Sequence, residues 1–373
     1  MKRLGFLLLL LAGLASCRKD PAPLPAEISR VEADPGSVLK GMYLVNEGNM
    51  SMNKASLDYL DLRNGLYTRN LYNQVNPQIT KGLGDVANDI GIYGNKLYVV
   101  VNLSNKVEVL EVKTGKRLGQ IDIINGRYVT FANGKAYVSA YVGKVYDPNS
   151  PNGVVAEIDT TALNITRMVA VGRQPEELAV VNNKLYVANS GGYSPNNYER
   201  TVSVVDLNTF TETKRIDVAI NLHRLKADKY GDLYVTSRGD YYNVPSKLLV
   251  VDTQTEKVKR TFDLAASNLA IDDDVAYVIA TEWNQSQQKN TISYNTIDVK
   301  NELLLSRPFI SDGTQNSIIL PYGINVNPYT KEVYLTDAKD YVTPGKLHCY
   351  TPDGKLKWSV TTGDIPAHMV FVK

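Results

Sequence analysis

A short pattern, an apolar residue followed by tyrosine and a second apolar residue, recurs seven times along the chain. It occurs in the segments MYLVNE, LYVVVN, AYVSAY, LYVANS, LYVTSR, AYVIAT and VYLTDA, with tyrosine at positions 43, 98, 137, 186, 234, 277 and 334. Around each tyrosine the sequence predicts a weak first strand, a short turn, the tyrosine strand, and then a third and a fourth strand. A repeat of four strands with no convincing helix is typical of one blade of a β-propeller.

Seven such units predict an all-β fold, a seven-bladed β-propeller of four-stranded antiparallel blades. The chain enters at the second strand of a blade, 42–47, and its third and fourth strands are expected at 57–61 and 66–72. The missing first strand is predicted to be the C-terminal segment 367–372. Pairing this segment with the N-terminal blade closes the ring and removes its open edges. Residues 40–373 then form one domain.

The N-terminus has the features of an export signal. Lys2 and Arg3 precede an apolar run at 4–14, and the tetrapeptide LASC follows at 14–17. A charged start, a short apolar run and small residues before a cysteine describe a secretory signal. The LASC sequence resembles a bacterial lipobox, which implies removal of residues 1–16 as a signal peptide and lipidation at Cys17. The alternative is an ordinary signal peptide with an incidental cysteine.

Residues 17–39 are predicted to be a lipid-anchored tether, because four prolines interrupt a segment of little apolar periodicity. We therefore expect a protein anchored by lipid to the outer membrane, at the cell surface. Surface lipoproteins of Bacteroides-type cells usually carry several acidic residues after the cysteine. This chain has only Asp20 there, so the sequence leaves the membrane leaflet open.

Charge and cysteine content exclude some classes of partner and bond. Without Lys2 and Arg3 the chain keeps 41 − 2 = 39 basic residues against 39 acidic ones. A neutral chain lacks the basic footprint of a nucleic-acid-binding protein, so no nucleic-acid partner is expected. If Cys17 carries lipid, Cys349 has no cysteine with which to form a disulfide.

Long loops are predicted on one face only. In an up-and-down blade, the loops after the second and fourth strands share one face of the disc. Six second-to-third loops are long, and so are two fourth-to-first loops, 73–85 and 310–321, whereas the opposite face has tight turns. The six second-to-third loops are 48–56, 142–152, 190–200, 238–246, 281–289 and 338–344. A rigid scaffold that carries its variable loops on one face is typical of a binding protein.

The candidate ligand-binding residues lie on this face, at the ends of tyrosine strands, in the loops beyond them or where first strands begin. The chain has 24 Tyr but only 6 Phe, and a tyrosine both stacks on a ligand and hydrogen-bonds to it. The candidates are Asn46, Glu47, Arg127, Tyr141, Glu176, Tyr193, His223, Arg224, Arg238, Asp240, Tyr241, Tyr242, Trp283, Tyr322, Asp340, Tyr341 and His368.

The same residues give less support to catalysis. His223 and His368 lack the close spacing of a metal-ligand motif, and Cys349 lacks an evident partner for a thiol nucleophile. No glycine-rich phosphate loop follows a strand and opens a helix. We therefore predict no catalytic residue, metal or resident cofactor. The carboxylates expected near the mouth of the central channel, Glu47, Asp89, Glu176 and Glu282, leave a hydrolase or a calcium-dependent lactonase open.

The repeat LYVANS with VSVVDL resembles the YncE-like, YVTN-repeat propellers. The stretches MYLVNEGNMSMNKASLDYLD, VANSGGY, LHRLKAD, SRGDYYN and TTGDIPAH are more narrowly similar to the BtuG-type surface lipoproteins of Bacteroides relatives. This resemblance implies a protein that captures cobalamin (vitamin B12) outside the cell and passes it to a BtuB-type TonB-dependent transporter. Arg224 or Arg238 would meet the cobalamin phosphate. Capture of a glycan or another cofactor, and a structural or adhesive role, remain alternatives.

Overall fold

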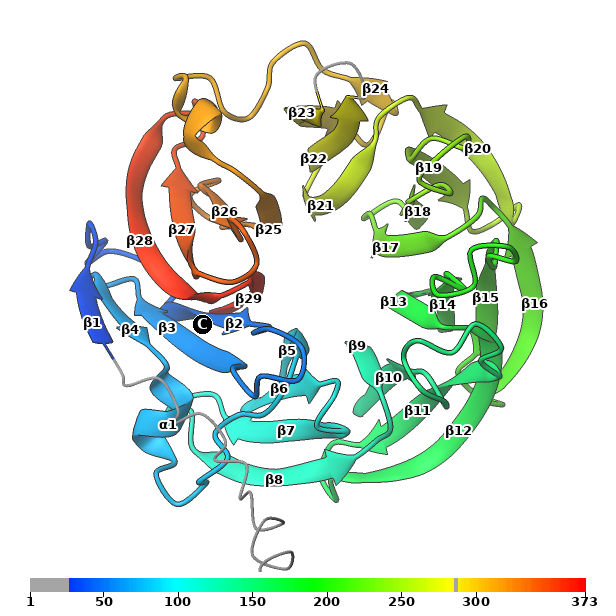
Figure 1. The fold of residues 1–373 in the computed structure, drawn as a ribbon, viewed down its shortest axis with the longest axis horizontal. Coiled ribbons are helices and arrows are strands. Elements are labelled where there is room, and N and C mark those ends of the chain that lie inside the picture. Colours follow the sequence, from blue (N-terminus) through cyan, green and yellow to red (C-terminus); the bar gives the residue numbers. More distant parts are fainter. Residues whose placement is uncertain (1–26, 285–287) are drawn as a thin grey trace, which may run out of the picture.

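The computed structural model describes residues 27–284 and 288–373, and it confirms the propeller prediction. Seven antiparallel sheets are arranged around a common axis (Figure 1). The predicted signal peptide and Cys17 lie outside the described residues. No helix in the described part of the chain is long and apolar enough to cross a membrane.

Blade one combines the two ends of the chain. Its strands are β29 (Pro366–Val372), β2 (Gly41–Asn46), β3 (Ser56–Asp61) and β4 (Leu66–Arg69). β29 pairs antiparallel with β2, with Val372 opposite Gly41 and His368 opposite Val45. The C-terminal strand therefore closes the ring, as the sequence predicts.

The other six blades follow in sequence order, each with its first strand nearest the axis (Figure 1). Blades two to four contain β5 (Ala87–Tyr93), β6 (Lys96–Val101), β7 (Lys106–Glu111), β8 (Arg117–Asp122), β9 (Gly126–Ala132), β10 (Lys135–Ala140), β11 (Asn152–Asp159), β12 (Asn164–Arg173), β13 (Pro175–Val181), β14 (Lys184–Asn189), β15 (Thr201–Asp206) and β16 (Thr211–Asp217). Blades five to seven contain β17 (Leu222–Ala227), β18 (Asp232–Ser237), β19 (Lys247–Asp252), β20 (Lys257–Phe262), β21 (Ala266–Asp272), β22 (Val275–Asn284), β23 (Lys289–Asp298), β24 (Leu303–Leu304), β25 (Pro321–Val326), β26 (Val333–Asp337), β27 (Pro344–Tyr350) and β28 (Leu356–Asp364).

The ordered fold begins earlier than the predicted boundary at residue 40. Strand β1 (Glu27–Arg30) pairs with the outer edge of β4 and makes blade one five-stranded. The chain then stays on the blade, because the Val31 amide donates to the Gly65 carbonyl and Leu39 is buried. The part of the predicted tether from residue 27 onward therefore belongs to the propeller. An outer strand leaves an edge of unpaired backbone groups, and β1 covers it.

The prediction of no helix is wrong in one place. The fourth strand of blade one was expected to reach Tyr72, but it ends at Arg69, because Asn70 turns the chain with a φ of 54°. A short helix follows, α1 (Leu71–Val75), together with a single 3-10 turn further on, η1 (Thr314–Ser317). The helix buries Tyr72, whose hydroxyl donates to the Glu108 carboxylate.

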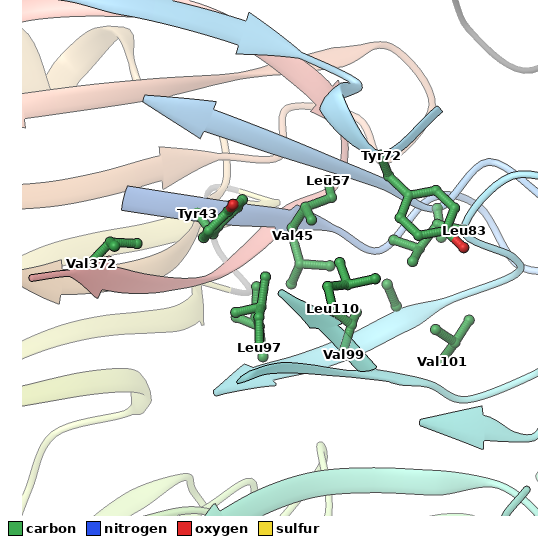
Figure 2. Packing of buried hydrophobic residues seen from close by; sticks show 13 residues of the cluster. Tyr43, Val45, Leu57, Tyr72, Leu83, Leu97, Val99, Val101, Leu110 and Val372 are labelled. Carbon is green, nitrogen blue, oxygen red and sulfur yellow. The ribbon is translucent and has the colours of Figure 1, made fainter. Parts of the chain in front are cut away.

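The core lies between neighbouring blades. Tyr43 and Val45 of blade one pack against Leu97 and Val99 of blade two (Figure 2). Six of the seven repeat tyrosines are at most 1% exposed, and Tyr277 is partly buried against another cluster. The repeat tyrosines are therefore packing residues, as expected, and they fix each blade against the next.

Every first strand has a register shift at its start, seven in all among the described blades. In blade five, for example, Leu222 pairs with Ser237 but Leu225 pairs with Val235. The first strand therefore advances three residues where the second strand advances two. A β-bulge of this kind re-aims side chains. Because first strands are innermost, the bulges bring polar residues from several blades together near the axis.

Candidate functional site

The long loops of different blades meet on one face of the disc, which we call the loop face. The side chain of Tyr146, from blade three, stacks edge-on against Tyr193 of blade four with ring centroids 5.0 Å apart. The Tyr146 hydroxyl also donates to the Met50 sulfur of blade one. Asn49 of blade one donates to the Tyr341 carbonyl of blade seven. These contacts between loops of different blades show that the long loops lie on the same face, as predicted.

A cavity of about 510 Å³ opens among these loops, and we call it the upper cavity. The bulged starts of the first strands form its floor, and second-to-third loops form its walls. The predicted ligand-binding residues that line it are Arg127, Glu176, Tyr193, His223, Arg224, Arg238, Tyr241, Tyr322 and Tyr341. These residues come from blades three, four, five and seven, and the cavity lining from blade six includes Ser267 and Thr281. The arrangement of the blades around one axis is what brings them together.

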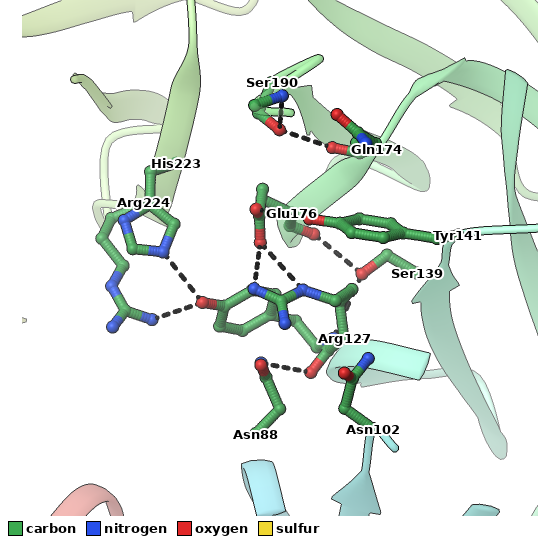
Figure 3. A network of polar contacts seen from close by, with 12 residues as sticks. Asn88, Asn102, Arg127, Ser139, Tyr141, Gln174, Glu176, Ser190, His223 and Arg224 are labelled. Atoms are coloured by element: carbon green, nitrogen blue, oxygen red, sulfur yellow. Dashed lines mark hydrogen bonds and ion pairs between the residues drawn. The ribbon is translucent and has the colours of Figure 1, made fainter. Parts of the chain in front are cut away.

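Glu176 is the anionic centre of the upper cavity, with only 2% of its surface exposed. Arg127 donates to its Oε2 from Nε at 3.2 Å and from Nη2 at 2.9 Å (Figure 3). The Tyr141 hydroxyl donates to Oε1 at 2.7 Å, and Arg238 Nη1 lies 3.7 Å from the same oxygen. One buried carboxylate is therefore shared by two guanidinium groups, which leaves the cluster with net positive charge.

Tyr128 and Arg224 form a polar layer beneath this centre. The Arg224 guanidinium donates from Nη1 to the Tyr128 hydroxyl and to His368 Nε2, both at 2.9 Å. The Tyr128 hydroxyl lies 3.0 Å from His223 Nε2. Since this hydroxyl already accepts from Arg224, its own proton is directed at His223, which places the His223 proton on Nδ1.

His368 continues the same chain of hydrogen bonds. Its Nδ1 lies 3.2 Å from Asp89 Oδ1, so Nδ1 carries the proton and Nε2 accepts from Arg224. Burial, followed by the charge of nearby arginines, holds the pKa of both His223 and His368 well below the ordinary value. Both imidazoles are therefore neutral at physiological pH.

Two carboxyl groups in the layer have raised pKa values. Burial raises the pKa of Glu47 to about 7, although Arg127, Arg224 and the Tyr322 hydroxyl favour its ionised form. The Tyr322 hydroxyl lies 3.1 Å from each Glu47 oxygen. Burial likewise raises the pKa of Asp89 to about 7. Glu47 thus contributes only part of a negative charge near neutral pH.

A second cavity of about 420 Å³, the lower cavity, lies on the other side of the layer. Its charged lining residues are Asp89, Glu177 and Lys226, together with His368. Glu177 accepts from Lys226 Nζ and, at 2.8 Å, from the Leu225 amide. The carboxylates of the lower cavity therefore have partners within the protein: Glu177 pairs with the Lys226 cation, and Asp89 accepts from the neutral His368 and from the Val129 amide. His368, predicted to bind ligand from the loop face, belongs to this lower site.

Exposed aromatic side chains lie on the loop face, and we call Tyr193, Tyr241, Tyr242, Trp283 and Tyr341 the aromatic rim. Tyr193, Tyr241 and Tyr341 line the upper cavity, whereas Tyr242 and Trp283 belong to loops of the same face. Tyr242 is 90% exposed and Trp283 54%, and the other three are at least 37% exposed. Tyr241 and Tyr341 occupy equivalent places in their loops, each with a φ near 60° and directly after an aspartate. A surface of this kind, flat and amphipathic, is typical of ligand recognition.

Four predicted residues do not face a ligand. Asn46 and Tyr141 are buried, and they support β3 and Glu176 respectively. Asp240 accepts the backbone amides of Tyr242, Asn243 and Val244, and Asp340 accepts those of Val342 and Thr343. Both aspartates therefore fold their own loops, because a short carboxylate readily caps the amides that follow it.

Tyr128 and Glu177 were missing from the prediction, and Asp89 was predicted near the mouth of the channel but not as a ligand-binding residue. Each directly follows an axial residue at the start of a first strand, in the pairs Arg127-Tyr128, Asn88-Asp89 and Glu176-Glu177. Because of the β-bulge, both residues of each pair face the axis. In the sequence, two consecutive polar residues at the start of a first strand, in place of alternating polar and apolar residues, would have indicated this.

Comparison with protein families identifies residues 40–362 as a match to DUF5074, described as a domain of unknown function. The chain belongs to this family. No curated protein matches the chain. Within the described residues no cluster of three or more His, Cys, Asp or Glu is placed to hold a metal ion.

Solved structures show likeness at the level of the fold. A quinonprotein alcohol dehydrogenase-like protein from Bacteroides thetaiotaomicron is 15% identical, with a TM-score of 0.63 over 89% of this chain and 78% of that one. A 6-phosphogluconolactonase-like protein from Bacteroides uniformis is 11% identical, with a TM-score of 0.62 over 89% and 99%. Hydrazine synthase from Kuenenia stuttgartiensis is 14% identical, with a TM-score of 0.62 over 76% and 88%.

Proposed function

We propose that this protein is a non-enzymatic binding protein, anchored by lipid at the cell surface, that captures cobalamin and delivers it to a TonB-dependent outer-membrane transporter. The observation that carries the proposal is that an arginine-lined cavity and an exposed aromatic rim occur together on one face. The turns that join strands within a blade on the opposite face are short, and the longer segment 31–40 is hydrogen-bonded to the blade-one turn there. A ligand of broad surface thus has one place to dock.

Cobalamin has the chemistry that this face suits. It is large and rigid, with an apolar corrin edge, a fringe of amides and one phosphate. It exceeds the upper cavity, so only part of it would enter while the rest lay on the aromatic rim. A rigid ligand on a preformed surface loses little conformational entropy, which favours tight binding.

The position of the N-terminus supports delivery at a membrane. Glu27 of β1 pairs with Arg69, the end of β4 from which the chain continues to β5 over the loop face. The described chain therefore begins at the rim of the loop face. Ten residue-to-residue steps connect Cys17 with Glu27 (27 − 17 = 10), and a chain of ten steps spans at most about 36 Å. A lipid at Cys17 would hold the loop face close to the membrane that contains the transporter.

Titration calorimetry with cyanocobalamin tests the proposal. We expect binding to the wild-type protein, weakened by Tyr242→Ala by roughly tenfold, because an exposed aromatic in an interface contributes about 1–2 kcal/mol. Tyr329→Ala is the matched control, since Tyr329 is 49% exposed in a turn of the opposite face. It should leave the affinity unchanged. Absence of binding at micromolar ligand would refute cobalamin capture.

Capture of a glycan on the same face is a second candidate, because the aromatic rim also offers planes on which sugar rings stack. The prominent exposure of Tyr242 and Trp283 favours it. Oligosaccharide binding that is lost in Tyr242→Ala, with no response to cyanocobalamin, would establish this candidate instead.

A further inference from the structure

Arg224 is a buried cation without a carboxylate partner. Its side chain is 3% exposed, and its guanidinium lines the floor of the upper cavity. Within the described residues it forms no ion pair, and its two side-chain hydrogen bonds go to neutral groups, the Tyr128 hydroxyl and His368 Nε2. Its buried Nε has no hydrogen-bond partner at all. A buried charge left in this condition is costly, so proteins rarely keep one without a use.

The two neighbouring arginines differ from Arg224. Arg127 forms a two-point contact with Glu176, and Arg238 lies near the other oxygen of the same carboxylate. The carboxylates that act electrostatically on Arg224 are Glu177 and Glu47. Glu177 is paired with Lys226, and within the described residues neither carboxylate forms an ion pair with Arg224. The upper cavity is therefore lined by three guanidinium groups and one ion-paired carboxylate, Glu176, and Arg224 is the one of the three that has no carboxylate within ion-pair distance.

We propose that Arg224 is an anion-binding residue, which receives a phosphate or carboxylate group of the ligand at the floor of the upper cavity. This inference adds an anion-binding residue to the proposed function, and the identification of the ligand as cobalamin rests on that proposed function. It selects Arg224 over Arg238 as the phosphate partner and sets the orientation of the ligand. The anionic group enters first and meets Arg224, while the apolar body stays above, against the aromatic rim. A guanidinium offers the paired donors that such an anion accepts.

Inorganic phosphate tests the anion site without any assumption about cobalamin. Phosphate should raise the melting temperature of the wild-type protein above that in chloride at equal ionic strength, because a ligand of the folded state stabilises it. Arg224→Gln keeps a donor for Tyr128 but removes the charge. The apparent phosphate affinity should fall by about tenfold or more, since hydrogen bonds to charged groups are strong.

Arg260→Gln is the matched control for this measurement. Arg260 lies exposed on the outer strand β20 and lines neither the upper nor the lower cavity. Its phosphate response should equal that of the wild-type protein. A response in Arg224→Gln equal to that of the control would overturn the proposal, and so would a wild-type protein that responds to phosphate no more than to chloride.

A structural measurement covers the case in which Arg224→Gln fails to fold. Crystals of the wild-type protein soaked in tungstate, a phosphate analogue with strong anomalous scattering, should show the anion within hydrogen-bond distance of the Arg224 guanidinium. Tungstate bound only to surface lysines would be an adventitious ion and would contradict the assignment.

Cobalamin and cobinamide separate this inference from the proposed function. Cobinamide keeps the corrin ring but lacks the nucleotide phosphate. If cobalamin is the ligand, Arg224→Gln should weaken cyanocobalamin binding by about tenfold and leave dicyanocobinamide binding within twofold. Equal loss for both ligands would contradict the role of Arg224. If the wild-type protein binds neither corrinoid, cobalamin capture fails, whereas the phosphate experiment still decides the anion site.

Discussion

First strands line both the upper and the lower cavity, five of them the upper and all seven the lower, yet the charges of the two cavities are arranged differently. In the lower cavity Glu177 pairs with Lys226 and Asp89 pairs with His368. In the upper cavity Glu176 is shared by Arg127 and Arg238, and Arg224 remains without a carboxylate within ion-pair distance. The carboxylates of the lower cavity thus have partners within the protein, whereas our proposal gives the unmatched cation of the upper cavity a partner from outside it. The difference indicates which of the two cavities receives a ligand.

The strongest test of this comparison is removal of the charge on Glu176. Glu176→Gln leaves Arg127 and Arg238 without their carboxylate in a buried site, so the free energy of unfolding should fall by roughly 3–5 kcal/mol. The exposed pair of Glu212 with Arg215 provides the control. Glu212→Gln should cost under about 1 kcal/mol. Denaturant unfolding measures both, and equal losses would show that Glu176 is not the electrostatic centre of the site.

From the raised pKa of Glu47 we predict a pH dependence of the free energy of unfolding. Its pKa is raised from an ordinary 4.5 to about 7 by burial, so between these values the folded state holds a proton that the unfolded state has lost. The folded state therefore loses stability as pH rises from about 4.5 to about 7. Glutamine imitates the protonated carboxyl. Over this window Glu47→Gln should gain roughly 1–3 kcal/mol relative to the wild-type protein.

Denaturant unfolding of both proteins at a series of pH values checks this gain. The comparison must be made as a difference, because the neutral His223 and His368 have lowered pKa values. Their contribution has the opposite sign and is lost as pH falls below about 6.5. It is present in both proteins and cancels. A difference between variants that stays flat with pH would show that Glu47 titrates normally.

The smallest expected effect belongs to the lower cavity. Glu177→Gln weakens its contacts with Lys226 and the Leu225 amide, and Lys226 remains partly exposed to water. The loss of stability should be roughly 1–2 kcal/mol. Because these charges serve only the protein, calorimetry should find ligand affinity at the upper cavity within twofold of the wild type. A large loss of affinity would instead assign the ligand to the lower cavity.

The fold could be predicted from the sequence because the same strand pattern recurs in each blade of a propeller. Each blade has a tyrosine at the equivalent position of its second strand, such as Tyr98 and Tyr234, so the assignment of one repeat supports the assignment of the others. The ends of the first blade were harder to predict. β1 is exposed along its whole length and adjoins a proline-rich segment, and it forms only because β4 offers an unpaired edge.

The site was only partly accessible, because its contacts cross the ring. Asp89 meets His368 and Tyr128 meets Arg224 at separations in sequence that no local pattern records. Arg224 was predicted for its position, but its lack of a carboxylate could not be read from the sequence. Tyr141 was chosen as an aromatic at a strand end, and the structure shows it buried against Glu176. Position in a repeat predicts the face of a residue but not its partners.

Hydrogen exchange with and without cyanocobalamin tests most directly the claim that the loop face is the ligand-binding surface. We predict protection of peptides from the loops 190–200, 238–246 and 338–344, and unchanged exchange in the turns of the opposite face, such as 228–232 and 327–332. Protection confined to those turns, or no protection anywhere at saturating ligand, would contradict the account.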